Sequence, residues 1–408
     1  MTFNKNKIIN DPLHGFLTIP TDLIFDVIQH PYFQRLRRIR QLGMSDWVYP
    51  GATHTRFHHA LGALNLTLQA MDTLRRKGIE ITDKEYESTA LAILLHDIGH
   101  GPYSHTLEHT LIQGVHHEDI STRIMQRLNE IFKGELETAI EIFQHKYTQK
   151  PFLSQLISGQ LDMDRLDYLL RDSFYTGVSE GIVGGERIIS MLNVVDGNLV
   201  VEEKGIYSVE KFLIARRLMY WQVYLHKTVI AADAVLVSIL QRARVLAHKG
   251  HALGSYHPLL HFLMNEVDTE HFDDEALDLF LVLDDIDIMA SVKQWQFHED
   301  PILSTLSKRL LYRKLPKVMI STIDFDAKEV AEASEQTMKK FGFSEGDTLQ
   351  YFVKTGVLEN HAYKSEGGGI RIMSKKGAVR DVAESSDNYN LAALKETVTK
   401  YYLTHWSR

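Results

Sequence analysis

The chain has 408 residues, and its 44% of hydrophobic and 24% of charged side chains predict an ordinary globular protein. It contains no Cys, which excludes disulfides, thiolate nucleophiles and cysteine-ligated zinc or iron–sulfur sites, so any metal must be held by nitrogen and oxygen. The formal net charge of −8 argues against a nucleic-acid-binding surface. Because there is no long apolar run and no N-terminal apolar targeting segment, we expect a cytoplasmic protein with no membrane partner.

Helical spacing of apolar residues runs through most of the chain up to residue 316. Residues 22–43 are predicted to be helical with an interruption at Pro31, and Thr55 is predicted to cap a helix that closes near Gly78. A pattern without Pro or Gly from 208 to about 248 predicts one continuous helix. Further helices are predicted from 82 into the stretch 91–105 and at 118–132, 135–145, 151–157, 160–174, 257–267, 273–283, 288–295 and 302–312.

The remaining segments carry turn and strand signals. Residues 10–20 mix turn formers with short β-prone pieces and predict an irregular N-terminal segment, whereas Asp196-Gly197 between β-branched residues predicts a hairpin. After residue 316 the texture changes, with β-prone runs at 318–323 and 350–353, a helix at 327–341, and a last helix or strand at 391–403. We therefore predict a mainly α fold in two parts, a helical domain at 1–316 and a smaller α+β region at 317–408.

The stretch 91–105, LAILLHDIGHGPYSH, starts as an apolar helical run and ends in a cluster of ligand-type side chains. His96, Asp97, His100 and His105 fall within ten positions. A lone histidine is most often satisfied by an ordinary hydrogen bond, but polar groups removed from water without partners are costly. Four such groups together favour a bound cation, because neutral imidazole and carboxylate both donate lone pairs to divalent metals.

Two other segments supply matching ligand types. His58 and His59 lie one turn inside a predicted helix start, and the predicted helix at 160–174 carries Asp162, Asp164, Asp167 and Asp172. One His, a His-Asp pair and a distant Asp would give four nitrogen and oxygen ligands with positions left for water, which is an open, catalytic arrangement. Asp162 and Asp167 are interpreted as cap or helix-face carboxylates, and spacing alone leaves His58 as a rival to His59.

The ordered set of His, His-Asp and Asp resembles the HD-domain metal-dependent phosphohydrolases, with THTRFHHALG before the pair and HDIGHGPYSH around it. Within that superfamily, QLGMSDWVYPGATHTRFHHALG, HDIGHGPYSH, an HHE element and LDMDRLDYLLRD are similar to the deoxynucleoside triphosphate triphosphohydrolases. The similarity extends over about 10–248, with the motif core at about 50–175, and implies the helical HD-domain fold. It also implies a metal centre with four ligands: His59, His96, Asp97 and Asp164.

The resemblance implies roles for the residues around that centre as well. The implied catalytic histidines are His105 and His117, with His100 against a phosphate. The implied substrate contacts are Arg56, Arg165 and Arg216 for the phosphates, Gln41 and Asp172 for the sugar 3′-hydroxyl, and Leu42, Tyr168 and Tyr224 for the sugar and base. Tyr220 departs from the pattern, because some members have a His at that position.

These residue types suit the hydrolysis of a polyphosphate. A divalent ion polarises a phosphoryl oxygen and lowers the pKa of water, an imidazole can protonate the leaving 5′-oxygen, and arginines offset the charge of the triphosphate. The family resemblance implies deoxynucleoside and tripolyphosphate as products, a divalent cofactor (Mg, Mn, Fe, Zn or Ni), a regulatory nucleotide and a homo-oligomer, dimer or tetramer. Two alternatives stay open: a phosphohydrolase acting on another nucleotide or phosphomonoester, and a non-catalytic nucleotide-sensing protein.

Overall fold

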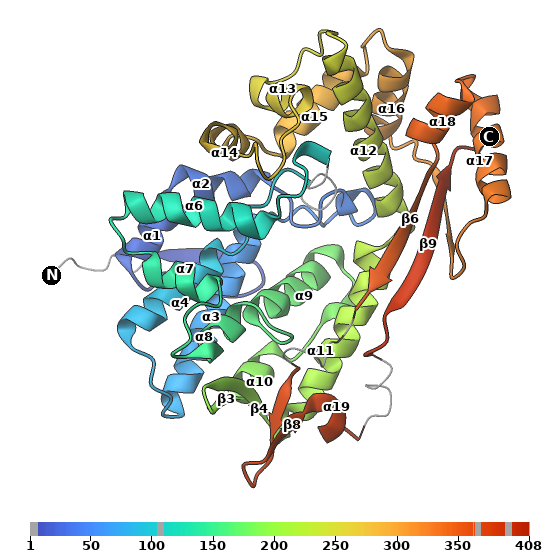
Figure 1. The fold of residues 1–408 in the computed structure, drawn as a ribbon. Coiled ribbons are helices and arrows are strands. Elements are labelled where there is room, and N and C mark those ends of the chain that lie inside the picture. Colours follow the sequence, from blue (N-terminus) through green and yellow to red (C-terminus); the bar gives the residue numbers. More distant parts are fainter. Residues whose placement is uncertain (1–6, 104–109, 362, 364–368, 388–393, 408) are drawn as a thin grey trace.

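The computed structural model describes residues 7–103, 110–361, 363, 369–387 and 394–407. Helices form most of this structure, and the strands described lie in an N-terminal hairpin and in two sheets that include the C-terminal region (Figure 1). One large hydrophobic core runs through the helical body, and a small separate cluster packs within the C-terminal region. The predicted mainly α fold with a smaller α+β appendage is confirmed.

The first element of the described residues is a short hairpin, and not the irregular segment that we predicted. β1 (Ile8–Asp11) pairs antiparallel with β2 (Gly15–Thr18). The carboxylate of Asp11 closes the turn, because its Oδ1 accepts hydrogen bonds from the backbone N–H of Leu13 at 3.0 Å and of His14 at 2.9 Å. This side-chain turn is what allows so short a segment to pair with itself.

Three helices carry the central part of the molecule: α3 (Arg56–Arg76), α4 (Asp83–Leu95) and α9 (Met163–Thr176). Both α4 and α9 pack against α3. The approach of α9 is close because position 62 of α3 is glycine: a Cβ there would lie 2.1 Å from side-chain atoms of Asp167 and Arg171 on α9. The N-terminal turns of α3 and α9 are thereby brought together.

Other helices surround these three, and all except α10 lie close to where the apolar spacing predicts them, although the helix predicted over 22–43 ends by Arg38. They are α1 (Asp22–Gln29), α2 (Pro31–Gln34), α6 (His117–Ile131), α7 (Glu137–Phe143), α8 (Pro151–Ile157), α10 (Gly185–Ser190), α13 (His257–Met264), α14 (Asp274–Leu281), α15 (Asp285–Trp295) and α16 (Pro301–Leu311). The predicted hairpin at Asp196-Gly197 is also present, with β3 (Leu192–Val195) and β4 (Asn198–Glu202) as its strands.

The prediction of one continuous helix over 208–248 is wrong. α11 (Ile206–Met219) runs into a π-helical turn (Tyr220–Tyr224), and α12 (Lys227–His248) starts afresh after it, with a bend of 55° between the two halves. The break needs no Pro or Gly, because the side chain of His226 accepts a hydrogen bond from the backbone N–H of Thr228 and caps α12. No single helix in the described ranges is long and apolar enough to cross a membrane, although this bent pair passes that test when taken together.

The C-terminal region builds two sheets. In the first, β9 (Val398–His405) lies between β5 (Lys317–Ser321) and β6 (Lys354–Asn360), and both pairings are antiparallel. In the second, β7 (Arg371–Met373) pairs parallel with β4 and antiparallel with β8 (Val379–Asp381). Because β4 belongs to the helical part of the chain, this second sheet ties the two predicted parts together, and a boundary at residue 317 stays a prediction.

The helices of the C-terminal region are α17 (Ala327–Phe341), as predicted, α18 (Glu345–Tyr351) and α19 (Val382–Ser385). The β-prone run at 350–353 is therefore helical at its start and becomes a strand only from Lys354. The described part of the predicted final element, 394–403, ends in a strand. Figure 1 shows β6 and β9 running alongside α12.

Candidate active site

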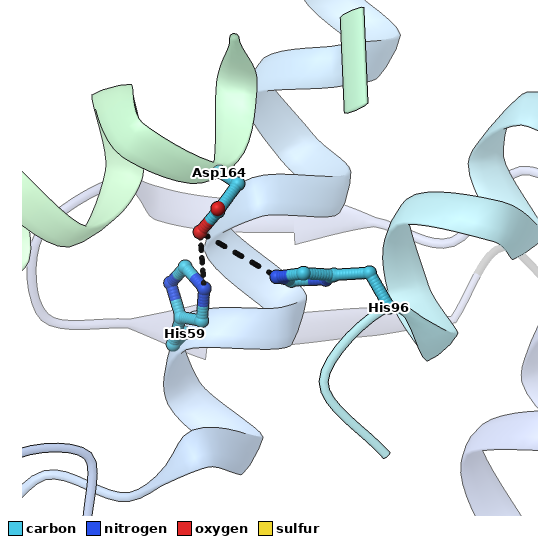
Figure 2. Close-up of side chains that lie close together, drawn as sticks. All are labelled: His59, His96 and Asp164. Atoms are coloured by element: carbon cyan, nitrogen blue, oxygen red, sulfur yellow. Dashed lines mark ion pairs between the residues drawn. The ribbon is translucent and has the colours of Figure 1, made fainter. Parts of the chain in front are cut away.

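The structure brings the four predicted metal ligands together from three separate segments. His59 lies in the first turns of α3, His96 and Asp97 directly follow α4, and Asp164 lies in the first turn of α9. Asp164 Oδ1 lies 3.1 Å from Nε2 of His59 and 3.5 Å from Nε2 of His96, as Figure 2 shows. Asp97 completes the group, with carboxylate oxygens 3.3 Å from His96 Nε2 and 3.8 Å from His59 Nε2.

Both imidazoles are held so that Nε2 faces this group. His59 Nδ1 is hydrogen-bonded to Asp167 Oδ2 at 2.8 Å, and His96 Nδ1 to the carbonyl oxygen of Ile93 at 2.6 Å. A proton on each Nδ1 leaves the lone pair on each Nε2, and both Nε2 atoms are buried without a hydrogen-bond partner among the described residues. Two orphaned imidazole nitrogens facing two carboxylates are the donor set that a divalent cation takes in proteins. These residues therefore fit a metal ion.

The electrostatics of the group point the same way. Burial alone would lower the pKa of His59, but the adjacent carboxylates of Asp164 and Asp167 outweigh burial and raise it to about 10. Burial also opposes ionisation of Asp164, whose pKa is nevertheless lowered by the adjacent imidazoles of His59 and His96. The pocket thus stabilises positive charge, which a bound cation can supply in place of protons.

Helix capping distinguishes the side chain of His58 from that of His59. Nδ1 of His58 accepts a hydrogen bond from the backbone N–H of Thr55 at 3.1 Å and lies 3.0 Å from the Thr55 hydroxyl. His58 therefore closes the capping box at the start of α3, and only the neighbouring His59 faces the other ligands. The predicted role of Thr55 at this helix start is also met.

A second layer of charged residues behind His59 was not predicted as functional. Asp167, which binds His59, also accepts hydrogen bonds from Arg171 at 2.9 and 3.1 Å and lies 2.6 Å from His14 Nε2. Arg171 in turn donates to Asp11 at 2.8 Å, and all of these carboxylates and the guanidinium are buried. The spacing of Asp164, Asp167 and Arg171 at three and four residues on one helix face was the available signal. No comparable spacing in the sequence points to Asp11 and His14, the partners from the N-terminal hairpin.

The turn that carries the His-Asp pair docks tightly onto α6. The hydroxyl of Ser121 donates to the carbonyl oxygen of His96 and accepts from the N–H of Gly99, both at 2.9 Å. A Cβ at position 99 would lie 2.2 Å from the carbonyl oxygen of His117 and 2.4 Å from the nitrogen of Ser121, so only glycine permits this contact. The docking brings His117, the first residue of α6, against His100.

Two of the three histidines predicted to contact or protonate the substrate, His100 and His117, lie together in the structure. The rings of His100 and His117 are stacked with centroids 3.9 Å apart, and His100 Nε2 lies 3.3 Å from Asp97 Oδ1. Possible ligand atoms of Asp97, His100 and His117 lie within 4.8 Å of one another, so this trio also has the geometry of a cation site. His105 lies outside the described residues.

A cavity of about 820 Å³ opens beside the metal ligands, and Asp97, Asp164, His100 and His117 contribute to its wall. This volume lies within the usual range for small-molecule sites. Most of the predicted substrate contacts also line it: Gln41, Leu42, Arg56, Tyr168, Asp172 and Tyr224. The residues predicted as metal ligands and most of those predicted to contact substrate therefore lie around one cavity, and their roles stay predictions.

Two of these wall residues are fixed by each other. The Tyr224 hydroxyl donates a 2.7 Å hydrogen bond to Asp172 Oδ2, and Asp172 Oδ1 lies 2.8 Å from Nε2 of the buried His54. Burial and the neighbouring Asp172 carboxylate raise the pKa of Tyr224, so its hydroxyl stays protonated and remains a donor. Nearby, Oε1 of Gln41 is buried without a hydrogen-bond partner among the described residues.

The three arginines predicted to hold phosphates differ in position. Arg56 lines the cavity and its Nη1 donates to Asp97 Oδ2. Arg165 and Arg216 are not among the lining residues. The guanidinium of Arg165 is paired with Asp162, whereas Arg216 is buried with Nε and Nη1 lacking hydrogen-bond partners in the described part of the chain. Their contacts with phosphate stay predictions.

Another part of the cavity wall comes from elements for which the sequence analysis predicted no function. α12, β6 and β9 contribute lining residues, among them Asp233, Lys354 and Tyr402. Residues of the 317–408 region therefore line the same cavity as Asp97 and Asp164.

Comparison with known proteins assigns the family. The HD domain family model matches residues 56–172, and a model described as an HD associated region matches residues 183–250. The crystal structure of a phosphohydrolase from Bacteroides thetaiotaomicron has 49% sequence identity and a TM-score of 0.94, with 98% of this chain and 99% of that chain covered.

Two curated relatives extend the comparison. The uncharacterized protein YwfO of Bacillus subtilis is 32% identical over 397 residues, which cover 94% of this chain and 88% of the relative. The deoxynucleoside triphosphate triphosphohydrolase SAMHD1 homolog of Dictyostelium discoideum is 32% identical over 241 residues, 55% of this chain and 46% of the relative. The match thus spans about half the length of that enzyme. With the HD ligands assembled and the family model matched, the chain belongs to the HD-domain phosphohydrolases.

Proposed function

We propose that the protein hydrolyses deoxynucleoside triphosphates to deoxynucleoside and tripolyphosphate in a metal-dependent reaction. The observation that supports this most is that Asp97 and Asp164 of the predicted metal cluster, Arg56 and the Asp172–Tyr224 pair line one cavity. The sequence similarity to relatives named as deoxynucleoside triphosphate triphosphohydrolases supports the same substrate class.

The proposed chemistry divides among residues of this chain. A divalent cation, when bound by the four ligands, supplies Lewis acidity and lowers the pKa of water. Arg56 offsets phosphate charge, and its contact with Asp97 holds the guanidinium beside the ligands. His117 delivers a proton to the leaving 5′-oxygen, and His100, stacked against it, keeps the imidazole in place and contacts a phosphate. His105 is proposed as a second catalytic histidine on the basis of the motif alone.

The sugar is proposed to lie against the Asp172–Tyr224 pair. The carboxylate of Asp172 has lone pairs left to accept a hydrogen bond from a 3′-hydroxyl, and the amide of Gln41 is positioned in the same wall. Leu42 and the ring of Tyr224 would crowd a 2′-hydroxyl and favour deoxyribose. Tyr168, 6.2 Å from Tyr224 by ring centroids and nearly perpendicular to it, completes the packing surface.

The assembly and setting are part of the same proposal. We infer a homo-oligomer, dimer or tetramer, acting in the cytoplasm, with a regulatory nucleotide as a further ligand. The donor set suits Mg, Mn, Fe, Zn or Ni, since two imidazoles and two carboxylates do not select among these ions. Light scattering with and without nucleotide tests the assembly.

The direct test begins with metal analysis of the purified protein, followed by a panel of deoxynucleoside and ribonucleoside triphosphates in the presence of that metal. Chromatography of the products for nucleoside and tripolyphosphate should show both in equal amounts from deoxynucleotides. An Asp164→Ala preparation serves as the control for contaminating phosphatases. Release of orthophosphate or pyrophosphate alone would contradict the proposal and favour a phosphohydrolase of another ester.

A further inference from the structure

The role of the C-terminal region follows from how it meets α12. The lining residues of α12 recur every three or four positions from Val229 to Gln241, so one helix face borders the cavity over about 18 Å. Most of that face is apolar, and its polar members are Asp233 and Gln241. The cavity therefore extends well beyond the metal ligands, along α12 and towards β6 and β9.

Strand β9 presents alternate residues to this part of the molecule. Lys400 places its ammonium 3.8 Å from the ring centroid of Trp221 in the π-helical turn, and two residues on, Tyr402 lines the cavity. Tyr402 and Asp233 line the same cavity, and burial together with the negative charge of Asp233 raises the pKa of Tyr402. β9 therefore contacts the π-helical turn through Lys400 and faces α12 through Tyr402.

The ring of Tyr402 is held in position by a glycine on the next strand. Gly356 of β6 is the direct cross-strand partner of Tyr402. A Cβ at position 356 would lie 2.5 Å from Cε1 and 2.7 Å from both Cζ and the hydroxyl oxygen of Tyr402. The ring therefore covers the bare backbone of Gly356, a packing that fixes an aromatic side chain and also protects the strand.

Lys354, two residues before Gly356 and on the same face of β6, closes this end of the cavity. Its ammonium donates a 3.0 Å hydrogen bond to Oε1 of Gln241 on α12. Among the described residues no carboxylate forms an ion pair with it, and burial lowers the pKa of Lys354. The contact joins strand to helix and orients the amide of Gln241.

The two ends of the cavity differ in the ligand chemistry they suit. Arg56 and a bound cation would favour polyphosphate at the metal end. At the other end the carboxylate of Asp233 repels phosphate, while the ammonium of Lys354 is engaged by Gln241 and burial lowers its pKa. A fixed aromatic ring beside a carboxylate and an amide suits a flat, neutral heterocycle that carries N–H donors, because bases stack on aromatic rings and carboxylates accept from their amino groups. With triphosphate at the metal end, a nucleobase is the part of the substrate that reaches this wall.

We propose that Tyr402, fixed by Gly356, and Asp233 form a nucleobase subsite in which the C-terminal sheet sets base preference. This inference rests on the proposed function for the placement of the triphosphate. It assigns the 317–408 region a direct role in substrate selection, because one of the two subsite residues comes from β9.

The test compares kcat/KM for dATP, dCTP, dGTP and dTTP in the full-length protein and in four variants. Tyr402→Leu should lower kcat/KM by roughly 10-fold, chiefly through KM, because stacking is lost. Asp233→Asn should lower it by roughly 5-fold for the three nucleotides whose bases carry an amino group, relative to dTTP. Gly356→Ala displaces the Tyr402 ring and should resemble Tyr402→Leu without changing any polar group. Tyr401→Leu, the neighbouring β9 residue on the opposite face, is the matched control and should behave as wild type.

The outcomes separate the subsite from the proposed function. Suppose that the wild type releases tripolyphosphate but the Tyr402 and Asp233 variants have the wild-type kcat/KM for all four nucleotides. The subsite is then wrong and the proposed function stands. A loss shared by Tyr401→Leu also overturns the subsite, because it reports damage to the sheet. If the wild type hydrolyses no triphosphate, the proposed function fails, and calorimetry with free deoxynucleosides then tests the subsite. Weaker binding to Tyr402→Leu than to Tyr401→Leu supports the subsite, and equal binding to the two variants overturns it.

Discussion

The two ends of the cavity are built in different ways. At the metal end, three of the four predicted ligands are held by a second contact: Asp167 behind His59, a backbone carbonyl behind His96, and Arg56 on Asp97. At the C-terminal end, the wall depends on strand pairing, since Tyr402 is placed by the register of β9 against β6. The metal end is thus assembled from the starts and ends of packed helices, and the other end from paired strands. The metal end suits a reaction step that is the same for every substrate, and the C-terminal end suits a surface that distinguishes one substrate from another.

The strongest test of this difference removes a metal ligand. Asp164→Ala should lower turnover of every nucleotide by at least about 1000-fold, because an open coordination shell loses both the cation and the polarisation it supplies. Metal content should fall while circular dichroism shows a retained helical fold, since Asp164 lies at the edge of α9 and is a quarter exposed. Activity near the wild-type level would refute the ligand assignment. A loss restricted to one base would contradict the separation of the two ends.

An intermediate effect is expected from the layer behind the ligands. Asp167→Asn keeps the size of the side chain but removes the charge that holds His59 Nδ1, and such changes typically cost 10–100-fold in metal affinity. Metal titration of the apoprotein, followed by turnover at saturating metal, measures this. Asp11→Asn is the matched control, because it removes the other carboxylate partner of Arg171 and leaves the Asp167–His59 hydrogen bond intact. Equal losses in the two variants would assign Asp167 to fold stability alone.

The same contrast explains what the sequence could reveal. The sequence shows three local groups of ligand-type residues, around His59, at His96-Asp97 and around Asp164. That these groups meet, and that His59 rather than His58 is the ligand, came from the resemblance to the HD-domain phosphohydrolases. Asp11 and His14 were not predicted, because their contacts with α9 arise only when the N-terminal hairpin folds against it. Tyr402 was beyond prediction for a similar reason: its position depends on pairing with Gly356, and no local pattern specifies that register. The break at Tyr220–Tyr224 was missed because a π-helical turn lacks the Pro or Gly that marks most helix ends.

The smallest effect is expected at His58, the residue next to a ligand that the structure assigns to capping. His58→Ala removes the acceptor for the N–H of Thr55 and should cost about 1 kcal/mol of the free energy of unfolding, as other cap losses do. Denaturant unfolding of the metal-loaded protein measures this cost. Metal content and turnover should stay close to wild type, whereas His59→Ala should lose the metal. If His58→Ala also released the metal, the two adjacent histidines would share the ligand role, and the start of α3 would be part of the metal centre and not only its support.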